Sequence, residues 1–198
     1  MPCLFIDIET VPIEIRNEEV KEYLMDKKIS KEARSFNPLY SRIIVLGIKE
    51  LNKPAEIYYD EKESELLNKF WTKVSSSPDT TIVTFNGYKF DIPFILIRST
   101  IHSVSQPLNI NTNRWSMEKS NHFDMMMFFS HYETFLNPSL EILAKILKVD
   151  TTNIEEVSAK GSDIERLYEE GNIELIKKKC QRDIEILEKV FKKAHSIP

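Results

Sequence analysis

The stretch CLFIDIET at residues 3–10 decides how the rest of this sequence is interpreted. It is short, apolar and bounded by Pro2 and Pro12, which predicts a β-strand. Because side chains alternate between the two faces of a strand, Asp7 and Glu9 point to the same face. The opposite face is apolar: Leu4, Ile6 and Ile8. Buried carboxylates are costly unless they are paired or bind a cation, so the strand predicts either two solvated acids at a strand end or part of a cation site.

The composition is that of one globular domain spanning residues 1–198, with 41% hydrophobic and 29% charged residues. The formal net charge is −4, from 27 basic and 31 acidic residues. This balance excludes a strongly basic nucleic-acid-binding protein, but it is compatible with a nuclease, whose metal site needs clustered acids. Any nucleic-acid affinity is expected to come from a local patch or from bound metal ions.

The two cysteines, Cys3 and Cys180, are too far apart in the sequence to indicate a zinc motif or a disulfide framework. A reduced, cytoplasmic protein is therefore expected. The acids at positions 7 and 9 interrupt the N-terminal apolar run, so no signal peptide is predicted. No apolar run approaches the ~20 residues that a membrane span requires, and no membrane partner is expected.

Three further strands are predicted, at 42–50, 55–59 and 80–85. The turn signal Asn52-Lys53-Pro54 joins the first two of these into a hairpin. A strand, a helix and another strand in series indicate a parallel pairing beside that hairpin. The pattern predicts an α/β fold with a mixed sheet flanked by helices.

Helices are predicted from capping residues and from apolar side chains at helical spacing. In the first half of the chain, helices are expected at 17–28 with Asn17 as the N-cap, after Asp60 with Glu63 in the first turn, and after Asp91 with Pro93 in the first turn. In the second half, they are expected at 125–129, after Asn137-Pro138, from a Ser162–Glu165 capping box to Gly171, and from Asn172 to about Lys193.

Two segments have less definite patterns. Residues 11–41 are polar and are predicted to form a surface connection, although they could cover one side of a site. Residues 104–121 form either a long loop or a ragged hairpin. They contain Arg114, Trp115 and Lys119, which suit contacts with a single strand of nucleic acid, while Trp115 could equally pack on the core.

Three more aspartates have both a structural and a functional interpretation. Asp183 fills the one gap in the apolar stripe of the last helix, where it could form an ion pair with Lys179 four residues earlier. Asp91 and Asp124 each precede a predicted helix, and aspartate is a good N-cap. Taken one at a time, these positions do not establish a site.

Taken together and in order, Asp7-x-Glu9, Asn86-x-x-x-Phe90-Asp91 and Asp183 resemble the DEDD superfamily of 3′–5′ exonucleases. The resemblance is greatest to the predicted exonucleases related to the proofreading domain of family-B DNA polymerases. Further stretches share that pattern: FDIETVP, VTFNGYKFDIP, HFDMMMFF, SLEILAKIL and GSDIERLYEEGNIELIKKKCQRDIEIL. The resemblance implies a ribonuclease-H-like fold, with a mixed, mostly five-stranded sheet flanked by helices.

The resemblance also implies roles for the site residues. Asp7, Glu9 and Asp183 match the acids that hold a first Mg²⁺ or Mn²⁺ ion, and Asp7 and Asp91 match those that place a second. Hard carboxylate oxygens suit these two metals. The remaining positions match residues around the substrate: Thr10 at the terminal nucleotide, Asn86 and Phe90 along the substrate path, and Asp124 in a supporting role.

The chain departs from the family at Lys179 and Lys178, where relatives carry a tyrosine or a histidine that orients or deprotonates the attacking water. A lysine normally stays protonated near neutral pH. Three outcomes are open. Metal coordination alone could acidify the water sufficiently, Lys179 could hold the scissile phosphate, or the enzyme could be impaired.

The resulting hypothesis is a metal-dependent 3′–5′ exonuclease that acts by a two-metal-ion mechanism on single-stranded DNA or RNA 3′ ends, with DNA favoured by analogy. Without a polymerase region, it is expected to act alone or with a replication or repair protein in trans. The main alternative is a weakly active or inactive nucleic-acid-binding or regulatory protein of the same fold. A small-molecule phosphodiesterase is a third interpretation.

Overall fold

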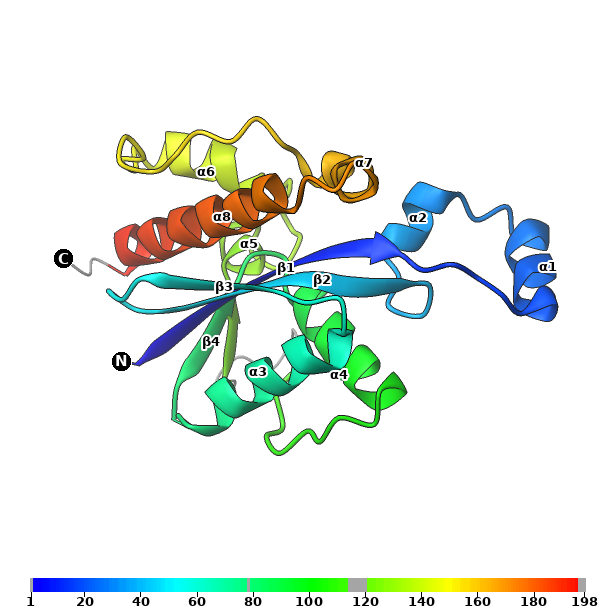
Figure 1. Ribbon diagram of the computed structural model, residues 1–198. Helices are drawn as coiled ribbons and strands as arrows, with labels where there is room; N and C mark the ends of the chain where they lie inside the picture. The colour runs from blue at the N-terminus through cyan, green and yellow to red at the C-terminus, as the bar shows by residue number, and fades with distance from the viewer. Residues whose placement is uncertain (1, 78, 114–120, 196–198) are drawn as a thin grey trace.

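The computed structural model describes residues 2–77, 79–113 and 121–195, with a five-stranded sheet at the centre (Figure 1). The strand order is β3-β2-β1-β4-β5. β1 and β2 pair antiparallel, as do β2 and β3, whereas β4 lies parallel to β1 and β5 parallel to β4. This confirms the predicted mixed, five-stranded sheet. The strands are β1 (Cys3–Pro12), β2 (Ser41–Glu50), β3 (Ala55–Tyr59), β4 (Thr81–Thr84) and β5 (His122–Asp124).

Helices cover both faces of the sheet, and two short helices extend beyond one end of it (Figure 1). On one face lie α5 (Met125–Phe129), α6 (Leu140–Ile146), α7 (Ile164–Glu169) and α8 (Ile173–Ala194). On the other face lie α3 (Glu63–Ser75) and α4 (Asp91–Ile101). The extension contains α1 (Glu18–Asp26) and α2 (Lys31–Ser35), which begin behind the capping side chains of Asn17 and Ser30. No described helix is both long and apolar enough to cross a membrane.

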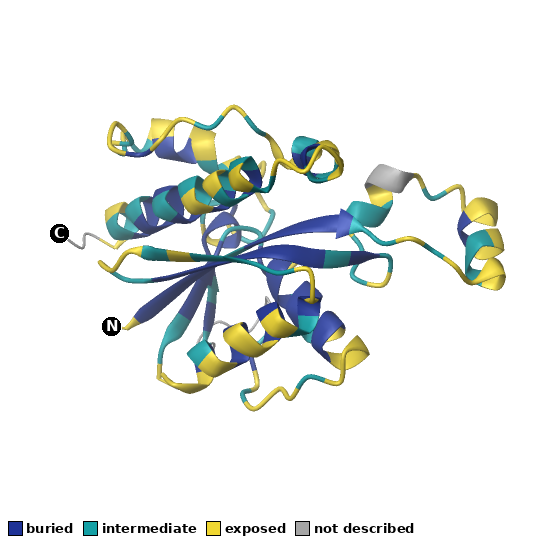
Figure 2. Cartoon of the chain, in the orientation of Figure 1, coloured by how far each residue is buried: buried dark blue, intermediate teal, exposed yellow. Residues whose placement is uncertain are grey.

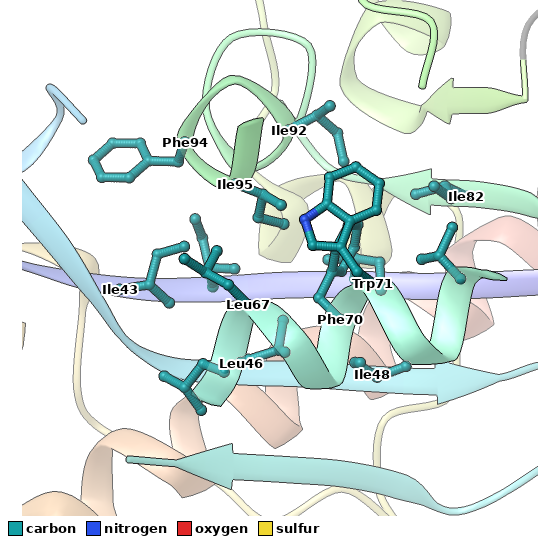
Figure 3. Packing of buried hydrophobic residues seen from close by; sticks show 14 of the residues in the cluster. Ile43, Leu46, Ile48, Leu67, Phe70, Trp71, Ile82, Ile92, Phe94 and Ile95 are labelled. Atoms are coloured by element: carbon teal, nitrogen blue, oxygen red, sulfur yellow. The ribbon is translucent and has the colours of Figure 1, made fainter. Parts of the chain in front are cut away.

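The alternation of β1 divides the core into two layers, as the sequence predicts. Leu4, Ile6 and Ile8 pack under α3 and α4, together with Phe70 and Trp71 (Figure 3). Cys3 and Phe5 face the other way and pack against α8. The helix α8 is buried on the side that faces the sheet and exposed on the other (Figure 2). Asp7 and Glu9 therefore point from the middle of the sheet toward α8.

The start predicted for α3 is wrong. Asp60 does not cap this helix. Its Oδ1 atom accepts a hydrogen bond from the Lys62 amide at 2.8 Å, and α3 begins at Glu63. Glu63 is only 4% exposed, because its carboxylate meets Arg98 of α4. A partner 35 residues away in the chain is not visible in a local pattern.

Three other local predictions differ from the structure. The capping box before α7 involves Lys160 and Asp163, not Ser162 and Glu165, and a 3₁₀ turn (Gly161–Asp163) leads into the helix. Asn172 precedes α8, but its side chain accepts no capping bond within the described ranges. The strand β5 has only three residues and was not predicted. Arg114, Trp115 and Lys119 lie outside the described residues.

Gly47 of β2 allows α8 to approach the sheet closely. A Cβ atom at this position would lie 2.7 Å from Cys180 Sγ and 3.3 Å from Ile57 Cδ1. We expect Gly47→Ala to lower the free energy of unfolding by about 1–3 kcal/mol because the core would be overpacked. The loss should be smaller in a Cys180→Ala background, where the sulfur is gone. Urea denaturation of the four proteins of this cycle measures the difference, and equal losses in both backgrounds would contradict the account.

Candidate active site

The candidate site lies where β1 extends beyond its parallel neighbour. β4 pairs with β1 only over residues 3–5 of the latter, whereas β2 pairs along most of its length. The amide of Ile8 therefore lacks a β4 partner and donates to Asp91 Oδ1 at 3.2 Å. Asp91 is the first residue of α4, and Phe90 occupies the N-cap position, so the capping interpretation of Asp91 is wrong. The hydrogen bond instead holds the Asp91 carboxylate beside the acids of β1.

One lysine and four carboxylates line a single cavity of about 250 Å³, and one of these carboxylates is Glu165 of α7. Asp7, Glu9 and Asp91 all contribute to it, with Lys179 of α8. Glu9 is 5% exposed and Asp91 3% exposed. Asp7 Oδ2 is buried and has no hydrogen-bond partner among the described residues. The alternative of two solvated acids at a strand end is therefore wrong.

Lys179 of α8 forms two ion pairs, one to Glu9 of β1 and one within α8 to Asp183. Its Nζ lies 2.8 Å from Glu9 Oε1 and 2.9 Å from Asp183 Oδ2. The other oxygen of Asp183, Oδ1, accepts from Arg182 Nη1 at 3.0 Å. Arg182 Nη1 also lies 3.0 Å from Glu141 Oε1 of α6. The ion pair predicted between Lys179 and Asp183 is thus present, and the same ammonium reaches Glu9 as well.

The described lining residues of the cavity do not include Asp183, Asn86 or Asp124. The structure thus brings Asp7, Glu9, Asp91 and Lys179 into one cavity, with Thr10 and Phe90, and it attaches Asp183 to this group through Lys179. The sequence predicted this grouping only through the family resemblance.

Burial and crowding of the acids shift their pKa values upward. Burial raises the pKa of Asp7 well above its usual range, and the charge of Glu9 raises it further, against the lowering effect of Lys179. Burial, together with the charge of Asp124, raises the pKa of Asp91 to about 8, although hydrogen bonds from backbone amides oppose it. Burial also raises the pKa of Glu9, and Lys179 opposes it. The cavity thus carries more acid than its single lysine neutralises, which favours an added cation.

The environment of Lys179 keeps it charged. Burial alone would lower its pKa, but the carboxylates of Glu9, Asp183 and Asp7 outweigh burial and raise the pKa above its usual value. The Lys179 ammonium therefore retains its proton at neutral pH, so it donates hydrogen bonds and cannot accept a proton from water.

The raised pKa of Asp91 has a consequence for stability. An acid whose pKa is higher in the folded than in the unfolded state contributes stability below its unfolded pKa, and this contribution is lost as the pH rises toward the folded pKa. For Asp91 this window runs from about 4 to about 8. In EDTA, we expect the free energy of unfolding to fall from about pH 5 to about pH 8, and to fall less steeply in Asp91→Asn. Urea titrations at both pH values test this, and identical pH dependences would contradict it.

The donor chemistry fits Mg²⁺ or Mn²⁺, although the side chains are not in ligating positions. Within the described part of the chain, no three His, Cys, Asp or Glu side chains are arranged to hold one ion. Lys179 instead lies between Glu9 and Asp183. The unpartnered Asp7 Oδ2 is the observation that fits a cation, since a buried carboxylate oxygen without a hydrogen bond is costly.

Asp124 organises the loop that leads to Asp91. Its carboxylate accepts from the amides of Asn86 at 2.9 Å and Tyr88 at 3.0 Å, and it also caps α5 by accepting from Met126 at 2.9 Å. Asn86 has a φ of 66°, a left-handed conformation that asparagine tolerates, so the loop can turn sharply before α4. The capping role of Asp124 is confirmed, and the same carboxylate shapes the turn beside the site.

The segment 11–41 covers one side of the cavity, which is the less favoured of the two predictions. Ser35 and Phe36, at the end of α2, line the cavity, and the Thr10 hydroxyl donates to the Ser35 carbonyl at 2.9 Å. Phe36 is 68% exposed, and its ring centroid lies 6.1 Å from that of Phe90. An aromatic residue within a polar stretch was the available signal. The sequence reasoning also missed four lining residues from the α7 region: Gly161, Ser162, Ile164 and Glu165.

Comparisons with known proteins agree with this fold. The structure resembles the family B DNA polymerase of the hyperthermophilic archaeon Pyrobaculum calidifontis, with a TM-score of 0.69 and 16% identity over 99% of this chain and 24% of the polymerase. This likeness confirms the ribonuclease-H-like fold, and the chain spans about a quarter of the polymerase. No curated relative matches.

Residues 42–188, which include Asp91, Lys179 and Asp183 but not β1, match the model of a predicted 3′–5′ exonuclease related to the exonuclease domain of PolB. The chain therefore belongs to the family of predicted 3′–5′ exonucleases related to the exonuclease domain of family B DNA polymerases.

Proposed function

We propose that this protein is a metal-dependent 3′–5′ exonuclease that hydrolyses the terminal phosphodiester bond of single-stranded nucleic acid, with DNA favoured over RNA. One observation carries the proposal: the carboxylates of Asp7, Glu9 and Asp91 line one cavity, Glu9 and Asp91 are buried, and the buried Oδ2 atom of Asp7 has no partner in the described structure. Burying several like charges is costly unless a cation joins them, and divalent ions suit phosphoryl transfer. The site is proposed to act within a single domain, residues 1–198.

In this proposal, Asp7, Glu9, Asp91 and Asp183 hold two Mg²⁺ or Mn²⁺ ions. When bound, such ions activate the attacking water and stabilise the leaving 3′ oxygen. The protein positions these acids rigidly: β1 carries the first two, and the Ile8 amide orients Asp91. Rigid placement of Asp7 and Asp91 reduces the reorganisation that the site needs when it binds the reacting phosphate.

The remaining residues are proposed to bind and orient the strand. Phe90 offers an aromatic surface in the cavity, Thr10 anchors the α2 end beside the terminal nucleotide, and Asn86 shapes the substrate path. Asp124 supports this path by fixing the Asn86 turn. Because Lys179 keeps its proton, it is proposed to contact phosphate and not to act as the general base.

A second candidate function is favoured by one observation, the position of Lys179 between Glu9 and Asp183. An ammonium group in that place could prevent metal binding, and the protein would then bind nucleic acid without cutting it. A regulatory protein of the same fold would result, acting alone or with a replication or repair protein. The predicted cytoplasmic location would suit either function.

Digestion of 5′-labelled single-stranded DNA and RNA separates these functions. The strands are incubated with Mn²⁺, Mg²⁺ or EDTA, beside an Asp7→Ala control. A ladder that shortens from the 3′ end, and that needs both metal and Asp7, would establish the exonuclease and identify its preferred sugar. Retardation of an intact strand would favour the binding protein, and turnover of dinucleotides alone would favour a small-molecule phosphodiesterase.

A further inference from the structure

The charges around the cavity divide into two unequal halves. In one half, the Lys179 ammonium neutralises Glu9 and Asp183 at 2.8 and 2.9 Å. In the other half, Asp91 Oδ1 accepts a hydrogen bond from the neutral amide of Ile8, and Asp7 Oδ2 meets no donor among the described residues. In the described structure, the first half thus has a cation within ion-pair distance of its carboxylates, whereas the second half has none.

The Lys179 side chain and the two carboxylates that it contacts are mostly shielded from solvent. Its side chain is 12% exposed, and its partners Glu9 and Asp183 are 6% and 22% exposed. The second oxygen of Asp183 is occupied by Arg182. Both oxygens of Asp183 thus meet basic groups, and a divalent ion that uses Asp183 and Glu9 must replace the Lys179 ammonium.

A lysine can make way for an ion without unfolding the helix that carries it. Its ammonium group sits on a flexible four-carbon chain, unlike the planar guanidinium of arginine. Displacement breaks two charge-assisted hydrogen bonds and returns the ammonium to a more exposed position, so it opposes binding of the ion. No comparable displacement is needed between Asp7 and Asp91.

We infer that Lys179 is a resident counter-ion that competes with a divalent cation for Glu9 and Asp183. The protein consequently binds its two ions unequally, the first beside Asp7 and Asp91 and the second only in exchange for the Lys179 ammonium. In this exchange the monovalent ammonium leaves the two carboxylates and a divalent ion enters, so the two negative charges of Glu9 and Asp183 are matched by two positive ones. This inference rests on the proposed metal-dependent function and specifies how the site is loaded.

Calorimetric titration with Mn²⁺, together with Mn²⁺ electron paramagnetic resonance to count bound ions, tests the inference without measuring hydrolysis. We expect the native protein to bind one ion, and to bind a second one weakly. In Lys179→Met, which keeps the length of the side chain and removes its charge, the second ion should bind on the order of ten- to a hundredfold more tightly. Lys179→Gln is measured as well, in case the methionine variant does not fold.

The matched control is Lys178→Met, because Lys178 is the adjacent lysine and pairs with Glu155 on the surface at 2.7 Å. This variant should bind Mn²⁺ as the native protein does. Identical titrations of the native protein and both Lys179 variants would overturn the inference, as would the absence of Mn²⁺ binding in all of them. Tighter second-site binding without any digestion of DNA or RNA would uphold the inference while refuting the proposed exonuclease.

Discussion

Asp7→Asn is expected to lower the rate of metal-dependent hydrolysis by about a thousandfold or more, the largest effect among single changes to the site. Asparagine keeps the shape of aspartate but removes the charge that attracts a cation. Asp7 lies in the central strand, and its Oδ2 is a buried oxygen to which no described residue donates a hydrogen bond. Its loss therefore removes the ligand best placed to bind an ion, while the core around β1 stays intact.

The rate is measured from the shortening of a 5′-labelled strand in excess Mn²⁺. Circular dichroism and urea denaturation should show that the variant folds as the native protein does. Glu14→Gln is a suitable control, because Glu14 is an exposed acid near the same strand, with a side chain 73% exposed. Hydrolysis at an undiminished rate in Asp7→Asn would refute the assignment of this carboxylate to the metal site.

Arg98→Met is expected to lower the free energy of unfolding by about 3–5 kcal/mol, the largest stability effect of a single substitution that we predict. The Arg98 and Glu63 side chains are 6% and 3% exposed, with Nη2 and Oε2 2.6 Å apart. Glu63 also accepts from the Ile43 amide at 2.7 Å, and Arg98 donates to the Pro38 carbonyl at 3.1 Å. The pair joins α3, α4 and β2, so removing the arginine leaves a buried carboxylate without its main partner.

Urea denaturation measures this loss, and two further variants control for it. Lys177→Met removes a lysine from a pair whose glutamate, Glu174, is 76% exposed, and it should leave the urea midpoint nearly unchanged. The double variant Glu63→Gln, Arg98→Met should lose less free energy of unfolding than the sum of the losses of the two single variants, because no buried charge is then left unpaired. A loss below about 1 kcal/mol in Arg98→Met would mean that the pair behaves as a surface ion pair.

Much of the fold could be predicted from local patterns. The alternation in residues 3–10 correctly placed Asp7 and Glu9 on one face, and the spacing of apolar residues located α3 and α8 to within a few residues. Pro93 in the first turn indicated where α4 begins. Such patterns are reliable because periodicity reflects which face of an element is buried. Short elements cannot be predicted in this way: β5 has three residues, too few to show a period.

The candidate site could be predicted only in outline. The order of acids along the chain indicated the family, and it nominated Asp7, Glu9, Asp91 and Asp183. Phe36 stood out as an aromatic residue within a polar stretch, but that pattern could not show which cavity its side chain reaches. The predicted caps at Asp60 and Ser162 failed for a related reason, since a polar side chain takes the partner that its surroundings offer.

The sequence by itself determined that this chain has an α/β fold with a mixed sheet, and that the central strand of the sheet carries two acids on one face. Only the tertiary structure decided how the charged groups of the site pair between separate elements. Lys179 meets Glu9 across 170 positions of the chain, and Asp91 meets the Ile8 amide across 83. The physical reason is that periodicity depends on neighbours along one element, whereas an ion pair depends on how separate elements pack. The packing of α8 against β1 places the Lys179 ammonium between Glu9 and Asp183.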